Sequence, residues 1–109
     1  MKTRGDALGI NIVVGNASSL AIDASSDFCG VMVQYPDTRG VATDLSGLVN
    51  KLHGAGALVV ACTDLMASTL LKPVGEMGVD IAVGSAQRFG VPMVCLMDFH
   101  YQHLCVLFV

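Results

Sequence analysis

The sequence predicts an α/β fold in which βαβ units form a mostly parallel sheet. Short apolar runs alternate with stretches of helical spacing, and glycines or turn-forming residues separate them. Hydrophobic residues make up 53% of the 109 residues and charged residues only 14%. Strands of a parallel sheet are covered on both faces and are therefore continuously apolar, which accounts for this composition. The length fits one small domain.

The first half of the chain is expected to contain two strands and one helix. Ile10–Val14 is a β-branched run that ends at a turn pair, and Cys29–Gln34 is a second apolar run followed by turn formers. Asp44 is expected to cap a helix over Leu45–Leu52, where leucines and a valine recur at helical spacing. Gly54 and Gly56 are expected to end that helix.

The second half adds two strands and another helix. Ala57–Cys62 is an apolar strand, and with the preceding strand and helix it forms a βαβ unit that is expected to be parallel and right-handed. Residues 65–71 are rich in Ala, Met and Leu and are expected to form a helix that stops before Pro73. Asp80–Gly84 is expected to be a short strand, followed by a polar segment over 85–90.

The charge and the apolar runs exclude two classes of partner. The formal net charge is −3 with six Lys and Arg residues in all, so the chain offers no basic patch to a phosphate backbone. The apolar runs are broken well short of the ~20 residues that span a bilayer. We therefore expect no nucleic-acid partner and no membrane partner. Four widely spaced cysteines favour a reducing compartment.

One cluster near the C-terminus has the residue types of a metal site. It comprises Cys95, Asp98, His100, His103 and Cys105. On a helix the two histidines would share a face, whereas on a strand they would point to opposite faces. The spacing matches no familiar zinc pattern, so we expect no metal site.

Asp64 has two interpretations from the sequence alone. It lies just past the carboxyl end of a predicted parallel strand, where open α/β sheets place their ligand sites. A carboxylate there can hold a cofactor nitrogen protonated. The same residue type and position suit an N-cap for the helix expected from Leu65 onward. Residue type and position favour the cap, and both interpretations stay open.

Four blocks of the sequence form a specific combination: Cys29–Thr38, Ala57–Leu65, Leu71–Glu76 and Val79–Met93. The last contains Gly-Ser-Ala-Gln-Arg-Phe-Gly-Val-Pro, which is the most specific of these motifs. From about Gly9 to Met93 the chain closely resembles the P-protein family of the glycine cleavage system. Members of that family are long chains built from two related halves, and this stretch resembles the N-terminal half.

The resemblance implies a fold, a reaction and partners. The expected fold is a fragment of the large domain of a fold-type-I pyridoxal-phosphate transferase. The family's reaction is glycine decarboxylation with transfer of the remaining aminomethyl group to the lipoyl arm of H-protein. The expected partners are therefore glycine, lipoyl H-protein and the remainder of the P-protein. The expected location is the mitochondrial matrix in a eukaryote, although no transit peptide is visible, and otherwise the cytoplasm.

The resemblance also implies roles for individual residues. The chemistry needs a lysine that holds the cofactor as a Schiff base and an acid that keeps its pyridine nitrogen protonated. Asp64 matches the position of the acid, but Gln87 occupies the place of the lysine, and an amide cannot form a Schiff base. The lysines of this chain, Lys2, Lys51 and Lys72, match no catalytic lysine. We expect a pseudo-site at Asp64 and Gln87, no catalytic residue and no turnover by this chain alone; pyridoxal phosphate is expected in the longer enzyme.

The resemblance ends at Met93 and divides the chain into two expected parts. Residues 1–93 are a partial P-protein domain, and residues 94–109 are an apolar tail outside the family pattern, which continues with a glycine-rich turn. Every valine codon begins with GT, the first two bases of an intron. We hypothesise that the tail is an unspliced intron read as coding sequence.

An alternative function is a non-enzymatic α/β interaction module that docks on P-protein or H-protein. A few strands of a larger sheet leave an unpaired edge and uncovered apolar faces. The sequence therefore also predicts poor solubility of the isolated chain.

Overall fold

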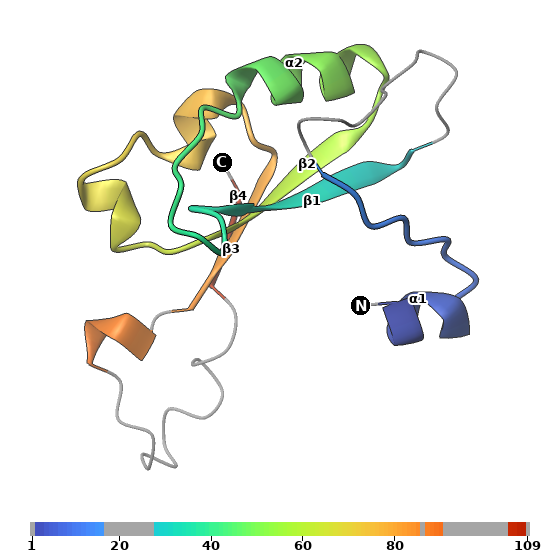
Figure 1. Ribbon diagram of the computed structural model, residues 1–109, viewed down its shortest axis with the longest axis horizontal. Helices are drawn as coiled ribbons and strands as arrows, with labels where there is room; N and C mark the ends of the chain where they lie inside the picture. Colours follow the sequence, from blue (N-terminus) through green and yellow to red (C-terminus); the bar gives the residue numbers. More distant parts are fainter. Residues whose placement is uncertain (1, 17–27, 86, 91–104, 109) are drawn as a thin grey trace.

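The computed structural model describes residues 2–16, 28–85, 87–90 and 105–108. Its sheet has the order β1-β2-β3-β4, and Figure 1 shows its arrangement. The first three strands are parallel and the fourth is antiparallel to the third. The predicted α/β class with a mostly parallel sheet is confirmed. The elements are α1 (Lys2–Ala7), β1 (Gly30–Tyr35), α2 (Ser46–Gly54), β2 (Leu58–Thr63), η2 (Ala67–Thr69), η3 (Val74–Met77), β3 (Ile81–Gly84), η4 (Gln87–Phe89) and β4 (Cys105–Phe108).

The first βαβ unit consists of β1, α2 and β2. The two strands pair in parallel over six positions, from Gly30 opposite Leu58 to Tyr35 opposite Thr63. β3 continues the sheet, with Val60 opposite Ile81 and Cys62 opposite Val83. Because the three strands run in the same direction, their carboxyl ends lie at one edge of the sheet. That edge is where an α/β sheet is expected to carry its ligand site.

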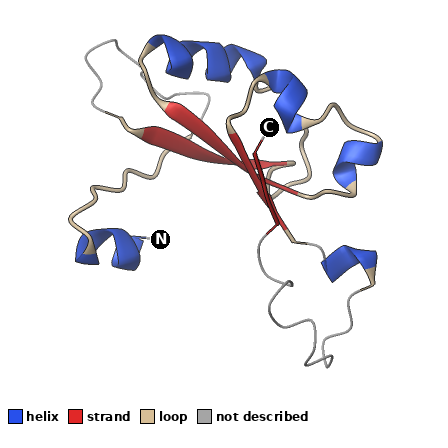
Figure 2. Cartoon of the chain, turned by 180° about the vertical axis from the view of Figure 1, so that it is seen from behind, coloured by secondary structure: helices blue, strands red, loops and turns tan. Residues whose placement is uncertain are grey.

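The core lies between the sheet and the helical segments on one of its faces. Figures 1 and 2 show α2, η2 and η3 on the same side of the sheet. Leu52 and Val49 of α2 are fully buried, as is Val59 of β2. Alternate residues of β2 point to this face, because successive side chains of a strand point to opposite sides. The apolar stripe of α2 therefore meets the inward-pointing half of β2.

The opposite face of the sheet is not covered by any helix of the described part of the chain. Met32 of β1 and Leu58 of β2 are 47% and 53% exposed there, and Val60 and Ile81 are only half-buried. α1 stands apart from the sheet (Figures 1 and 2). Parallel sheets are normally covered on both faces. This surface, defined by Met32, Leu58, Val60 and Ile81, is called the open face below.

Two predicted elements differ in the structure. Residues 10–14 do not form a strand, because they pair with no strand of the described sheet, and a β-branched run needs such a partner. The helix expected over 65–71 is only the 3₁₀ turn η2, whose backbone bonds include Thr69 N–H to the Met66 carbonyl. Pro73 follows closely and leaves little length for an α-helix. α1, η3 and β4 were not predicted.

The start of α2 also differs in detail from the prediction. Leu45 holds the N-cap position and has no side-chain capping bond. The Asp44 carboxylate instead accepts the backbone N–H of Ser46 at 2.9 Å and its hydroxyl at 2.6 Å. Asp44 therefore accepts one of the free N–H groups of the first turn, but it does so from the residue before the N-cap and not from the N-cap itself. The C-terminal stop is confirmed, because α2 ends at Gly54.

Asp80 links β3 to both α2 and β2. Its Oδ2 accepts the backbone N–H of Val59 at 2.7 Å and lies 3.0 Å from Nε2 of His53. The Val59 N–H bond, followed by the bond to His53, lowers the pKa of the Asp80 carboxyl below its ordinary value of 3.8. A carboxyl with a lowered pKa in the folded state stabilises the fold above pH 3.8, and this stabilisation is lost as the pH falls below that value.

Asp80→Asn is therefore expected to make the folded chain less stable at neutral pH and to weaken its loss of stability in acid. The measurement is the urea midpoint of the dilute chain from neutral pH to below pH 3.8. Glu76→Gln, which removes an exposed carboxylate elsewhere, controls for the change in net charge. An acid dependence as steep in Asp80→Asn as in the unchanged chain would rule out this role for Asp80.

Candidate functional site

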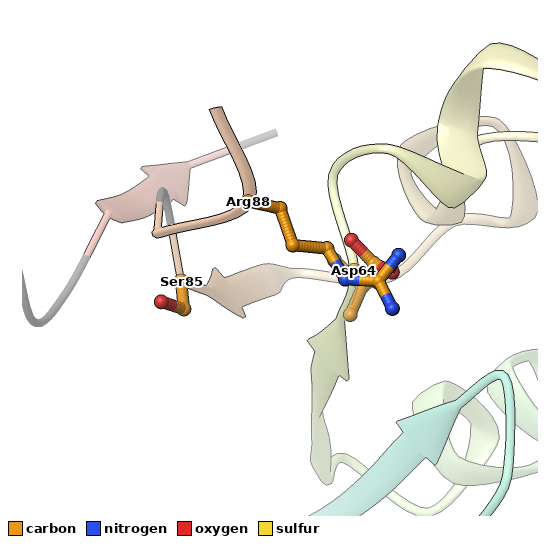
Figure 3. A pocket seen from close by; sticks show the side chains of 4 residues that line it. Asp64, Ser85 and Arg88 are labelled. Carbon is orange, nitrogen blue, oxygen red and sulfur yellow. The ribbon is translucent and has the colours of Figure 1, made fainter. Parts of the chain in front are cut away.

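The carboxyl ends of the parallel strands border an open pocket. Its volume is about 430 Å³, and it is lined by Thr63, Asp64, Ser85 and Arg88. Figure 3 shows these side chains from close by. Thr63 ends β2 and Asp64 follows it, while Ser85 follows the end of β3. The pocket is where parallel-strand topology places a ligand site.

Asp64 uses both of its carboxylate oxygens. Oδ1 accepts the backbone N–H of Met66 at 3.1 Å, which stabilises the turn that leads into η2. Oδ2 lies 2.9 Å from Nη1 of Arg88. The contact with Met66 corresponds to the capping interpretation of Asp64. It differs in that the segment it precedes is a 3₁₀ turn, which begins later than the α-helix expected from Leu65. The second contact is an ion pair that the sequence did not predict.

Arg88 reaches this site from η4, beyond the end of β3. Figure 3 shows its side chain extending toward Asp64, with the guanidinium beside the carboxylate. Gln87, which the resemblance placed at the lysine position, is the first residue of η4 and the immediate neighbour of Arg88. The only sequence signal for Arg88 is its place in the polar segment after the third parallel strand, whereas Asp64 directly follows the second.

The floor of the pocket is tightly packed. Thr63 is buried, and within the described part of the chain its hydroxyl has no hydrogen-bond partner. Gly84 faces the Thr63 carbonyl so closely that a Cβ on Gly84 would lie 2.6 Å from that oxygen. The ends of β2 and β3 therefore approach each other more closely than any residue with a side chain permits.

The described residues contain neither a candidate metal site nor a candidate membrane span. No three of their His, Cys, Asp and Glu side chains are grouped closely enough to hold a metal ion. His100, His103, Cys95 and Asp98 lie outside the described residues. Among the helices that the structure describes, none has the length and apolar character needed to cross a bilayer. Cys29 and Cys62 are free thiols.

Comparison with known families shows to which family the chain belongs. The family model of the glycine cleavage system P-protein matches residues 1–95. The chain belongs to the glycine cleavage system P-protein family. The resemblance carried by the four sequence blocks is therefore confirmed.

Relatives in bacteria and plants agree with this assignment. The chain is 54% identical over 93 residues to a glycine dehydrogenase (decarboxylating) of Aliivibrio fischeri (strain MJ11), covering 85% of this chain and 9% of that protein. It is 50% identical over 92 residues to the mitochondrial glycine dehydrogenase (decarboxylating) 1 of Arabidopsis thaliana, covering 84% of this chain and 9% of that protein. The chain thus spans about a tenth of the length of these P-proteins.

A solved structure confirms the fold. It is a crystal structure of glycine decarboxylase (P-protein) of the glycine cleavage system in inhibitor-bound form. The TM-score is 0.75 at 32% sequence identity, over 99% of this chain and 24% of that chain. The predicted fragment of a fold-type-I domain is therefore confirmed.

The residues at the pocket do not fit pyridoxal phosphate, on which the family generally depends. The pocket lining among the described residues includes no lysine. Lys2 lies on α1, Lys51 on α2, and Lys72 between η2 and η3. Asp64, the one carboxylate among the described residues that line the pocket, already faces a guanidinium. This lining therefore has neither a Schiff-base amine nor a carboxylate that is free of a cation.

Proposed function

We propose that this chain is a structural part of the N-terminal half of a glycine dehydrogenase (decarboxylating), and that it performs no turnover alone. The observation that carries the proposal is a strand-edge pocket with a carboxylate but no lysine, in a chain of the P-protein family. In the longer enzyme, pyridoxal phosphate supplies the electron sink for glycine decarboxylation, and the aminomethyl group passes to lipoyl H-protein. The catalytic lysine belongs to the other half of that enzyme.

Within this function, Asp64 and Gln87 form a pseudo-site. Asp64 accepts the Met66 N–H in the turn before η2 and pairs with Arg88 of η4, so its carboxylate contacts the segments that follow two neighbouring strands. Gln87 is proposed to stand where the other half carries its lysine. Residues 1–93 supply the family domain, and residues 94–109 are proposed to lie outside it. The expected location is the mitochondrial matrix in a eukaryote, since the Arabidopsis relative is named mitochondrial, and otherwise the cytoplasm.

The open face favours a second candidate function, a non-enzymatic interaction module. Its exposed Met32 and Leu58 form an apolar surface of the kind that binds protein. In this reading the chain docks on P-protein or H-protein through the open face. The same surface suits the first function, in which the remainder of the P-protein covers it.

Substitutions on the open face are expected to change solubility. Met32→Lys combined with Leu58→Lys is expected to raise the soluble fraction of the expressed chain several-fold, because it breaks an apolar surface without entering the core. Val59→Lys, on the adjacent but fully buried position, is the matched control and is expected to abolish soluble expression. Equal soluble fractions for the double variant and the unchanged chain would show that the open face does not limit solubility.

The proposed lack of turnover is tested with the purified chain. The chain is incubated with pyridoxal phosphate, carboxyl-labelled glycine and lipoyl H-protein, and released carbon dioxide is counted. The Aliivibrio fischeri enzyme serves as the positive control. We expect release at the level of the buffer. An absorbance band is a weaker readout, because Lys2 and Lys51 are exposed amines that can themselves react with the aldehyde. Glycine-dependent release above the buffer level would contradict the proposal.

A further inference from the structure

We propose that Arg88 is the specificity-determining residue that keeps the pyridoxal-phosphate ring from binding to Asp64. The inference rests on the proposed function, because it takes the strand-edge pocket as a pseudo-site of the family. The guanidinium of Arg88 lies beside the Asp64 carboxylate, which is the group that a protonated ring nitrogen would need.

The contacts of Asp64 carry this inference. Oδ1 is held by the Met66 N–H at 3.1 Å, so it is fixed by the local turn. Oδ2 is the oxygen directed toward η4, and Arg88 Nη1 lies 2.9 Å from it. The guanidinium therefore occupies the oxygen with which a protonated pyridine nitrogen would form a charge-assisted contact.

The charges lead to the same conclusion. A lone carboxylate favours a protonated ring nitrogen because opposite charges attract. The Asp64–Arg88 pair has no net charge, and a second cation placed beside Oδ2 would also meet the guanidinium. The neutral pair therefore does not attract a protonated pyridine ring, which is the form that the cofactor's chemistry requires.

The exposure of the pair argues against a mainly stabilising role. The Arg88 side chain is 67% exposed and that of Asp64 is 29% exposed. Ion pairs that are this accessible to solvent contribute little to the stability of a fold. The effect of the pair on what Asp64 can bind can therefore be measured without a large loss of stability. Arg88 can be replaced without removing a buried contact.

The probe for the test is 4′-deoxypyridoxine 5′-phosphate, the analogue in which a methyl group replaces the aldehyde. It keeps the ring nitrogen and the phosphate but cannot form a Schiff base with Lys2, Lys51 or Lys72. Its binding to the unchanged chain, Arg88→Met and Arg88→Lys is measured by equilibrium dialysis, and circular dichroism verifies that each variant is folded. Arg88→Gln replaces Arg88→Met if the latter does not fold.

The expected result is tighter binding by Arg88→Met, by about tenfold, which corresponds to one charge-assisted contact regained. Arg88→Lys keeps the cation and should bind like the unchanged chain. Asp64→Asn added to Arg88→Met should remove the gain. The direction of the change in affinity distinguishes two roles of Arg88, because the probe is an anion. If Arg88 served only to attract anions, its removal would weaken binding of the probe.

Equal or weaker binding by Arg88→Met would overturn the role of Arg88 and leave the proposed function intact. Saturable binding by the unchanged chain as tight as that by Arg88→Met would overturn it as well. Glycine-dependent carbon dioxide release by the unchanged chain would instead contradict the proposed function. The two failures are thus measured separately.

Discussion

Leu52→Ala is expected to remove most of the stability of the chain and to lower its urea midpoint strongly. Leu52 is fully buried between α2 and the sheet, beside Val49 and Val59, which are also fully buried. Truncation of a buried leucine costs about 2–5 kcal/mol, because it removes apolar burial and leaves a cavity. Small domains are stable by only about 5–15 kcal/mol in total, and a sheet with one open face is expected near the lower limit. The loss is therefore comparable to the whole stability.

The measurement is the urea midpoint of the dilute chain, followed by far-UV circular dichroism. Asn50→Ala lies on the exposed side of the same helix and is the matched control, with an expected change within about 0.5 kcal/mol. A midpoint for Leu52→Ala equal to that of the control would show that α2 does not pack on the sheet as described.

Gly84→Ala is the second substitution with a large expected effect. A Cβ at residue 84 would lie 2.6 Å from the carbonyl oxygen of Thr63 and 3.5 Å from Cγ of Leu65. The first neighbour is backbone, so β2 and β3 must move apart to admit the methyl group. Such overpacking costs about 1–3 kcal/mol. The shift also moves Ser85 and η4, and with them the contact between Arg88 and Asp64.

Gly47→Ala is the control for the change in residue type. Gly47 lies on α2, and a Cβ there would meet nothing within 4 Å. It is expected to be neutral or to stabilise the chain by up to about 1 kcal/mol, since alanine favours a helix over glycine. The two substitutions should therefore have opposite signs in the same unfolding experiment. Equal midpoints for the two variants would contradict the close approach of β2 and β3.

The sequence predicted the centre of the fold better than its borders. The apolar runs at 29–34 and 57–62 became neighbouring parallel strands because each has a partner to pair with and a helix to cover one face. Residues 10–14 have a similar composition but no partner strand in the described sheet, and they are not a strand. Local composition therefore determined which segments can be strands, and tertiary pairing determined which of them are.

The candidate site was predicted only in part for a related reason. Asp64 was recognised because its place after β2 follows from strand direction alone. Arg88 was missed because its partner is 24 residues away in the sequence, and only the fold brings η4 to the end of β2. The same distance explains why both interpretations of Asp64 stayed open. Whether a carboxylate caps a turn or binds a cation depends on neighbours that the local sequence does not contain.

The most direct test of this account uses a chimera of the Aliivibrio fischeri glycine dehydrogenase (decarboxylating). The stretch of that enzyme that matches this chain over 93 residues is replaced by the corresponding residues of this chain. Bound pyridoxal phosphate and carbon dioxide release are measured for the chimera with and without Asp64→Asn. If this segment supplies structure and a pseudo-site, both proteins bind the cofactor and release carbon dioxide at similar rates. A folded chimera that loses its cofactor and its activity on Asp64→Asn would contradict the account.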